Sequence, residues 1–163
     1  QNNHTEFRTG IGYDVHAFDK GKAVILCGIK IPYKYSLMGH SDADVSMHAI
    51  TDALYGAIAE GDIGTWFPPN EPKWKNKDSE IFLTHSKNLL SNRGFKISNI
   101  DCTIVCEEPK INPHVEEMKE NIARILDIER QRVSIKATTS EKLGFIGRQE
   151  GIATHAIATV IKN

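Results

Sequence analysis

The sequence is poor in cysteine, lacks any long apolar run and has no excess of either charge. Its 3 cysteines, Cys27, Cys102 and Cys106, form no Cys-x-x-Cys pair and are too few for a disulfide-rich scaffold. We expect each to fill a strand as a small apolar residue in a reducing compartment. No apolar stretch approaches the length of a membrane-spanning helix, so no membrane partner is predicted.

The charges are almost balanced, with 20 Lys and Arg against 21 Asp and Glu and a formal net charge of -1. A protein that binds nucleic acid would show a basic excess, so that class of partner is not expected. A length of 163 residues with 40% hydrophobic residues suits one domain with a proper core. We therefore predict a disordered polar tail at residues 1–7 and a single domain at residues 8–163.

The densest group of polar side chains lies between His40 and His48 (HSDADVSMH). Ser41 followed by Asp44 is typical of a capping box that opens a helix, and Gly61 is a plausible stop. This predicts that His48 lies about two turns inside the helix, by the rise per turn. The expected apolar face of this helix comprises Val45, Ala49, Leu54, Ala57 and Ile58.

Two residues of an alternating segment near the start, Asp14 and His16, are spaced to project from the same face of a strand. Together with His48 they would supply three ligands, the number that a catalytic zinc takes while keeping an open position. Asp44 and His48, four apart on a helix, form a rival pair. The spacing alone leaves both pairings open, and a helix with ordinary surface histidines is the plain alternative.

The remaining segments alternate between strand and helix patterns. Residues 33–39 are expected to form a loop, and Asn112 with Pro113 is expected to cap the third helix. This pattern predicts one mixed sheet with helices packed on it. Further strands are expected over residues 23–31, 95–107, 132–138 and 152–161, and helices from Asp78 or Ser79 to Arg93 and over residues 112–126.

Four motifs follow one another along the chain: residues 12–18 (GYDVHAF), 39–44 (GHSDAD), 61–64 (GDIG) and 138–145 (TTSEKLGF). In this order they resemble the 2-C-methyl-D-erythritol 2,4-cyclodiphosphate synthase family of the non-mevalonate isoprenoid pathway. The resemblance covers residues 8–162, and it implies an α+β fold with a four-stranded mixed core sheet and helices packed on one face. It also implies a homotrimer with active sites between subunits.

The family's reaction is an intramolecular phosphoryl transfer. The 2-phosphate of 4-diphosphocytidyl-2-C-methyl-D-erythritol 2-phosphate attacks the β-phosphorus, closes a cyclic diphosphate and expels CMP. Because the attacking phosphate oxygen is already anionic, the protein mainly has to fold the substrate and neutralise charge. Metal ions and aimed hydrogen-bond donors suit that task.

The resemblance also implies roles for individual residues. Asp14, His16 and His48 would bind Zn2+, and Glu141 would bind Mg2+ or Mn2+. His40 and Thr139 would stabilise the transition state, and Phe145 and Arg148 would lie near the trimer axis, where an isoprenoid diphosphate could bind. The substrate contacts would be Asp14, His16, His40, Ser41, Asp62, Gly64, Phe67, Cys106, Pro109, Lys110, Ile111, Asn112, Ala137, Thr138, Thr139, Glu141, Phe145 and Arg148.

Three positions depart from the family's usual pattern. Pro69 stands where an acidic residue is common, Ser140 replaces a third threonine, and Glu107 with Glu108 makes the expected cytidine loop more acidic than a phosphate neighbour should be. Two other functions stay open, a metal-dependent phosphohydrolase and a non-catalytic trimeric binder of isoprenoid diphosphate. The first residue is not Met, so we expect that a leader, tag or native segment was removed; the location would be cytoplasmic in a bacterium and plastid-like in a eukaryote.

Overall fold

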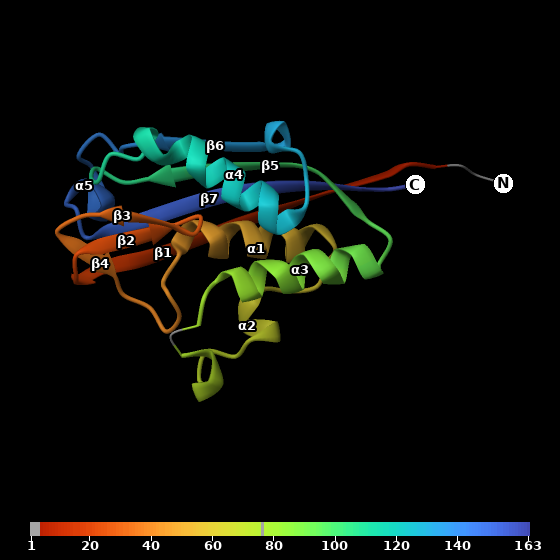
Figure 1. The fold of residues 1–163 in the computed structure, drawn as a ribbon, viewed down its shortest axis with the longest axis horizontal. Helices are drawn as coiled ribbons and strands as arrows, with labels where there is room; N and C mark the ends of the chain where they lie inside the picture. Colours follow the sequence, from red (N-terminus) through yellow and green to blue (C-terminus); the bar gives the residue numbers. More distant parts are fainter. Residues whose placement is uncertain (1–3, 76) are drawn as a thin grey trace.

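The fold is built on one mixed sheet of five strands, in the order β4-β1-β7-β5-β6. The computed structural model describes residues 4–75 and 77–163. β1 pairs antiparallel with β4 and β7, β5 pairs antiparallel with β7, and β5 and β6 are parallel (Figure 1). The strands of the sheet are β1 (Glu6–Lys20), β4 (Tyr35–Leu37), β5 (Lys96–Val105), β6 (Val133–Thr138) and β7 (Gly151–Lys162).

Two details of the expected sheet are wrong. The sheet has five strands rather than four, because part of the segment expected as a loop forms β4, which pairs with the end of β1 from Phe18 opposite Leu37 onward. The single strand expected over residues 23–31 is instead a separate hairpin of β2 (Ala23–Leu26) and β3 (Ile29–Pro32). Its turn places both Cys27 and Gly28 at positive φ, a conformation that the apolar pattern does not reveal.

The longer helices lie together on one side of the sheet (Figure 1), and α1 packs against β1 and β7. A Cβ built on Gly10 or Gly12 would lie 2.0 or 1.8 Å from the carbonyl oxygens of Ala53 and Ala49, so only glycine permits this approach. The helices are α1 (Val45–Ala57), α2 (Ile63–Trp66), α3 (Glu80–Asn92), α4 (Val115–Leu126) and α5 (Gly144–Gly147), with 3₁₀ turns η1 (Pro72–Trp74), η2 (Asn112–His114) and η3 (Arg130–Arg132).

The start of α1 differs from the expected one. Asp44, not Ser41, is the N-cap, and its carboxylate accepts a hydrogen bond from the Met47 backbone N–H. His48 therefore lies in the first turn of the helix rather than two turns inside it. The helix also ends at Ala57, before the stop expected at Gly61.

The other boundaries follow the sequence more closely. α3 follows Ser79 and is succeeded by Gly94 at a φ of 84°, as its pattern predicted. α4 begins later than expected, because Asn112 starts a 3₁₀ turn and makes no side-chain cap. The expected tail is shorter, since β1 begins at Glu6; residues 1–3 lie outside the described residues. In the described part of the chain, no helix has the length and apolar character needed to span a membrane.

Candidate active site

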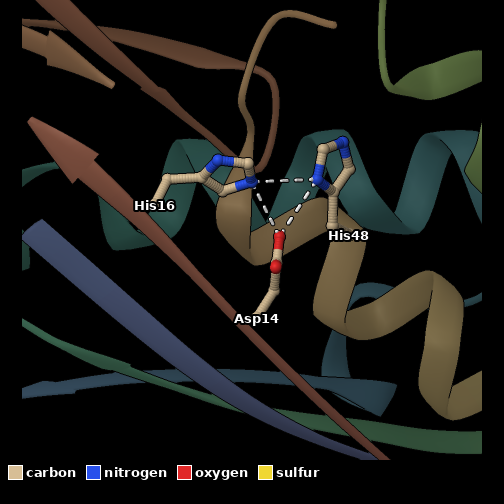
Figure 2. A group of neighbouring side chains, drawn as sticks. All are labelled: Asp14, His16 and His48. Carbon is tan, nitrogen blue, oxygen red and sulfur yellow. Dashed lines mark hydrogen bonds and ion pairs between the residues drawn. The ribbon is translucent and has the colours of Figure 1, made fainter. Parts of the chain in front are cut away.

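Asp14, His16 and His48 meet beside the N-terminal turn of α1. The three side chains point toward one another (Figure 2). Asp14 and His16 come from β1, and His48 comes from α1. Asp14 Oδ2 lies 2.9 Å from His16 Nε2 and 3.1 Å from His48 Nδ1, and the two ring nitrogens are 3.4 Å apart. The expected three-ligand cluster is therefore present in the fold.

The far nitrogen of each ring is held by the protein. His16 Nδ1 donates a hydrogen bond to the Met38 carbonyl oxygen at 2.6 Å, and His48 Nε2 lies 2.7 Å from Ser79 Oγ. These bonds leave His16 Nε2 and His48 Nδ1 facing Asp14. Ring orientation of this kind is typical of histidines that bind a metal.

The cluster's charges favour a cation. Burial raises the pKa of Asp14, but the hydrogen bonds and charges of His16 and His48 outweigh it and bring that pKa down to about 2. Burial lowers the pKa of His16, whereas the hydrogen bond and charge of Asp14 raise it, and the net shift is upward. An ionised carboxylate therefore faces two imidazoles, the donor set that zinc takes.

The three ligand atoms lie within 4.8 Å of one another, so one ion can contact all of them. Their side chains are only 12–28% exposed. The residues present thus fit a divalent metal with an open position toward the neighbouring cavity.

The rival pairing of Asp44 with His48 is wrong. Asp44 is fully buried, and its carboxylate oxygens accept the backbone N–H groups of Cys27 at 2.9 Å, Gly28 at 2.6 Å and Met47 at 2.9 Å. Those bonds tie the β2–β3 turn to the start of α1. The Asp44 carboxylate therefore has a structural role as a helix cap and turn acceptor, and it does not face the cluster.

A cavity of about 230 Å³ opens over the cluster. Of the remaining residues expected at the site, His40, Ser41 and Phe67 line it, and so does Pro69, which departs from the family pattern. The cavity is also lined by Asp52, whose Oδ1 accepts the Ile63 N–H at 2.8 Å and ties α2 to α1.

Asp62 and Gly64 flank Ile63 at the start of α2, beside this cavity. The Asp62 carboxylate accepts the Thr65 N–H at 2.9 Å and caps α2. Ile63 itself lines the cavity, whereas the capping bond occupies one oxygen of Asp62. The family resemblance led us to expect that Asp62 faces hydroxyl groups of the substrate. In the structure its carboxylate accepts a hydrogen bond from the Thr65 N–H of α2.

A second pocket, of about 150 Å³, shares no lining residue with the first. It lies where β5 and β6 end, and Thr139 lines both it and the adjoining hollow that contains Glu141. Glu141 is thus grouped with Thr139 and not with the three-ligand cluster. The expected residues in the pocket are Cys106, Pro109, Lys110, Ile111, Asn112, Ala137, Thr138 and Thr139.

The acidic character of this second region has a structural reason. Glu107 Oε2 accepts the Ser140 backbone N–H at 2.8 Å, which joins the two loops that form the pocket. Glu108 lies 3.6 Å from the Lys110 ammonium. Glu107 therefore holds the two loops together, and the Glu108 charge is partly balanced by Lys110.

Phe145 and Arg148 lie apart from both pockets, on and just after α5. Both are exposed, and Arg148 Nε donates to Glu150 Oε2 at 2.6 Å. Within one chain they form a surface turn with a paired guanidinium.

The sequence did not mark the residues that support the cluster. Ser79 was interpreted only as a helix cap, yet its hydroxyl bonds His48. Asp42 was counted only as one of the polar groups between His40 and His48, yet it bonds Ser79; Asp52 carried no expected role, although it holds α2. Only three-dimensional contact identifies them, because Ser79 is 31 positions away from His48.

The YgbB family model matches residues 7–161. The chain is 62% identical to the bifunctional enzyme IspD/IspF of Ruegeria pomeroyi over 157 residues, which is 96% of this chain and 42% of that protein. It is also 55% identical to the 2-C-methyl-D-erythritol 2,4-cyclodiphosphate synthase of Roseobacter denitrificans, over 96% of this chain and 99% of that protein. The chain thus spans about two fifths of the bifunctional relatives and nearly all of the single-function one.

Solved structures give the same relationship. The bifunctional IspDF from Campylobacter jejuni matches with a TM-score of 0.94 at 39% identity, over 98% of this chain and 43% of that one. The CDP complex of IspF from Plasmodium falciparum matches with a TM-score of 0.85 at 34% identity, over 99% of this chain and all of that one.

Proposed function

This chain belongs to the YgbB family, and on that premise we propose that it is a 2-C-methyl-D-erythritol 2,4-cyclodiphosphate synthase. It would convert 4-diphosphocytidyl-2-C-methyl-D-erythritol 2-phosphate to the cyclic diphosphate and CMP. The observation that carries the proposal is the convergence of Asp14, His16 and His48 beside a cavity of about 230 Å³, in a chain 55% identical to a synthase over nearly its full length.

In this reaction an oxygen of the 2-phosphate attacks the β-phosphorus, and the bond from that phosphorus to the oxygen bridging to the α-phosphorus breaks. CMP leaves with the bridging oxygen, so no water and no external base are consumed. The chain has to bring two anionic groups of one molecule together, which is a task of binding and charge neutralisation.

Zn2+ held by Asp14, His16 and His48, and Mg2+ or Mn2+ held by Glu141, would neutralise charge on the diphosphate. His40 and Ser41 line the cavity beside the cluster and would donate to phosphate oxygens. Hydrogen-bond donors aimed at the transferring group are used most fully in the transition state.

The candidate site has two parts within one chain. We call Asp14, His16, His40, Ser41 and His48 the metal half. We call the second pocket with Thr139 and Glu141 the nucleotide half, since the family resemblance assigns the cytidine contacts to residues that line it and a relative of the same fold forms a CDP complex. Because the two halves share no lining residue, we propose that the metal half of one subunit meets the nucleotide half of another.

An apolar sheet face supports assembly into a homotrimer. The side of β1 and β7 that faces away from α1 exposes Ile11 to 70%, Tyr13 to 48%, Val15 to 39% and Ile157 to 43%. A contiguous apolar patch on a folded chain is typical of a subunit interface. In a cyclic assembly of three copies, each interface would join one metal half to one nucleotide half.

The same assembly would bring three copies of Arg148 near the axis. Guanidinium groups so placed repel one another unless an anion lies between them, and Phe145 would add apolar surface. We propose that an isoprenoid diphosphate binds there. The named curated relatives are bacterial, which supports a cytoplasmic location over a plastid one.

The test is an assay of the purified chain with the proposed substrate, with separate detection of CMP and inorganic phosphate. The synthase predicts one CMP and one cyclic diphosphate per substrate, with no inorganic phosphate. Release of phosphate would favour the phosphohydrolase, because only that reaction transfers the phosphoryl group to water. A chain that binds an isoprenoid diphosphate but does not turn over the proposed substrate in the presence of zinc and magnesium would leave only the binder.

A further inference from the structure

A line of hydrogen bonds runs from His48 away from the metal cluster and into the protein. His48 Nε2 lies 2.7 Å from Ser79 Oγ, and the Ser79 hydroxyl in turn bonds Asp42 Oδ1. An ionised carboxylate only accepts, so the single hydroxyl proton of Ser79 goes to Asp42. Ser79 then accepts from the ring, which requires that His48 carry a proton on Nε2.

This proton position matters because a metal binds the unprotonated ring nitrogen. With the Nε2 proton held by Ser79, Nδ1 is the ring nitrogen that can bind a metal, which would take the place of the proton donated to Asp14; Nδ1 lies 3.1 Å from Asp14 Oδ2 and 3.4 Å from His16 Nε2. The bond to Ser79 also restrains rotation of the ring about its Cβ–Cγ bond. His16 is oriented in a comparable way by the Met38 carbonyl oxygen.

The two residues behind His48 are themselves fixed. Ser79 is fully buried at the start of α3. Asp42 Oδ2 accepts the Ser79 backbone N–H at 2.9 Å, Asp42 Oδ1 accepts the Asp44 N–H at 3.1 Å, and the Asp42 N–H donates to the Lys77 carbonyl at 3.1 Å. Because Asp42 bonds both the backbone N–H and the hydroxyl of Ser79, the Ser79 oxygen is oriented in advance to accept a hydrogen bond from the His48 ring.

Ser41 is the competing partner of the ring, and it is the weaker one. Its Oγ lies 3.2 Å from His48 Nε2, against 2.7 Å for Ser79. Ser41 also lines the open cavity, where phosphate is proposed to bind. Ser79, in contrast, has no role in the proposed reaction, and its hydroxyl bonds His48 and Asp42.

We infer that Ser79 and Asp42 are positioning residues that hold His48 in the orientation and protonation state needed to bind the metal. The inference rests on the proposed function, since that proposal supplies zinc as the metal. Partners of this kind change metal affinity by roughly 10–100-fold when they are removed. They would act on the metal through His48 without touching the substrate.

The test measures the zinc dissociation constant of the full chain by competition with a chromogenic chelator. Ser79→Ala is expected to weaken zinc binding by about 10-fold or more. Ser86→Ala is the matched control, because Ser86 is also a fully buried serine of α3, and its hydroxyl donates to the Leu83 carbonyl at 2.7 Å. The control should bind zinc as the unaltered chain does.

Equal zinc affinity in Ser79→Ala and the unaltered chain would overturn the inference. Equal weakening in Ser79→Ala and Ser86→Ala would overturn it too, since the loss would then come from packing of α3. An unaltered chain that binds no zinc would instead overturn the proposed metal. The failure of the inference is thus separable from the failure of the proposed function.

A second measurement needs no variant and guards against a Ser79→Ala chain that does not fold. In the zinc-loaded protein, the His48 Nε2–H proton should give a distinct nuclear magnetic resonance signal that exchanges slowly with water. Hydrogen bonding to buried Ser79 is the reason for slow exchange. A His48 ring proton that exchanges as fast as that of free imidazole would overturn the inference.

Discussion

The three metal ligands of the metal half are held by hydrogen bonds within one chain, whereas Thr139, Glu141 and Lys110 of the nucleotide half are exposed to solvent. Asp14, His16 and His48 are bonded to one another and 12–28% exposed. Thr139 and Glu141 are exposed, and the Lys110 side chain is 75% exposed. A single chain thus brings the three metal ligands together, and on the proposed assembly the nucleotide half would gain its facing surface from another subunit.

Burial accounts for much of this contrast. Asp14 and His16 lie half-buried on the face of β1 that carries the buried Gly10 and Gly12, and His48 lies in the first turn of α1; hydrogen bonds to Met38 and Ser79 hold the two rings. The nucleotide half consists of loops at the ends of β5 and β6, joined by the bond from Ser140 N–H to Glu107. Loops on a rigid scaffold are where binding groups commonly lie.

The largest expected effect separates the halves by their metals. His48→Ala should lose bound zinc and show no measurable turnover, because two remaining ligands do not hold the ion. Glu141→Gln should retain zinc and lose activity, since Glu141 lies outside the three-ligand cluster. Metal analysis of both purified variants, paired with the CMP assay, checks this. Zinc retained in His48→Ala, or zinc lost in Glu141→Gln, would contradict the assignment of zinc binding to the metal half alone.

A smaller effect is expected in the nucleotide half. Thr139→Val should lower kcat by about 100-fold, on the order of 3 kcal/mol, with KM little changed, because a transition-state donor is used fully only in the transition state. Zinc content should stay at the level of the unaltered chain, which serves as the internal control. An unchanged kcat with a raised KM would assign Thr139 to ground-state binding.

The smallest effect concerns Asp52, a half-buried carboxyl that lines the cavity of the metal half. Burial raises the pKa of Asp52 to about 6, helped by the charges of Asp62 and Asp14 and opposed by the Ile63 N–H. Because the folded pKa of Asp52 exceeds its ordinary value of 3.8, the folded state binds this proton more tightly than the unfolded chain. The metal-free protein therefore loses stability as pH rises from about 4 through 6, and the loss is complete above that range.

Asp52→Asn removes this cost while keeping an acceptor for Ile63. The variant should melt higher at pH 8 by about 2–4 °C for each kcal/mol recovered, and at pH 4 its melting temperature should match that of the unaltered chain. Thermal unfolding of the two chains after zinc removal gives the comparison. A shift of equal size at both pH values would contradict the titration of Asp52 as its cause.

Much of the site could be predicted from the sequence, because local spacing fixes part of it. Asp14 and His16 are two positions apart on one strand, and the two-residue period of a strand correctly predicted that both lie on the same face. Choosing Asp14 and His16 rather than Asp44 as the partners of His48 required the fold. Asp44 is bound by the Cys27–Gly28 turn, and that turn is absent from the apolar pattern, which predicted one continuous strand there.

The remaining errors have similar physical reasons. The pairing of β4 with β1 is a tertiary contact of three residues, too short to give a periodic signal. The support of His48 by Ser79 joins positions 31 apart. Local propensity predicts neither the β4–β1 pairing nor the Ser79–His48 bond. The separation of the two candidate pockets depends on the strand order of the whole sheet.

The most direct test of the account is complementation between two inactive variants. His48→Ala lacks only the metal half, and Glu141→Gln lacks only the nucleotide half. When the two chains are unfolded together and refolded at equal amounts, shared sites should restore about a quarter of the unaltered activity, because one site in four combines two intact halves. Chains refolded separately and then mixed should stay inactive if subunits do not exchange. No recovery in the co-refolded sample, with trimers present in sedimentation, would contradict a site built from two subunits.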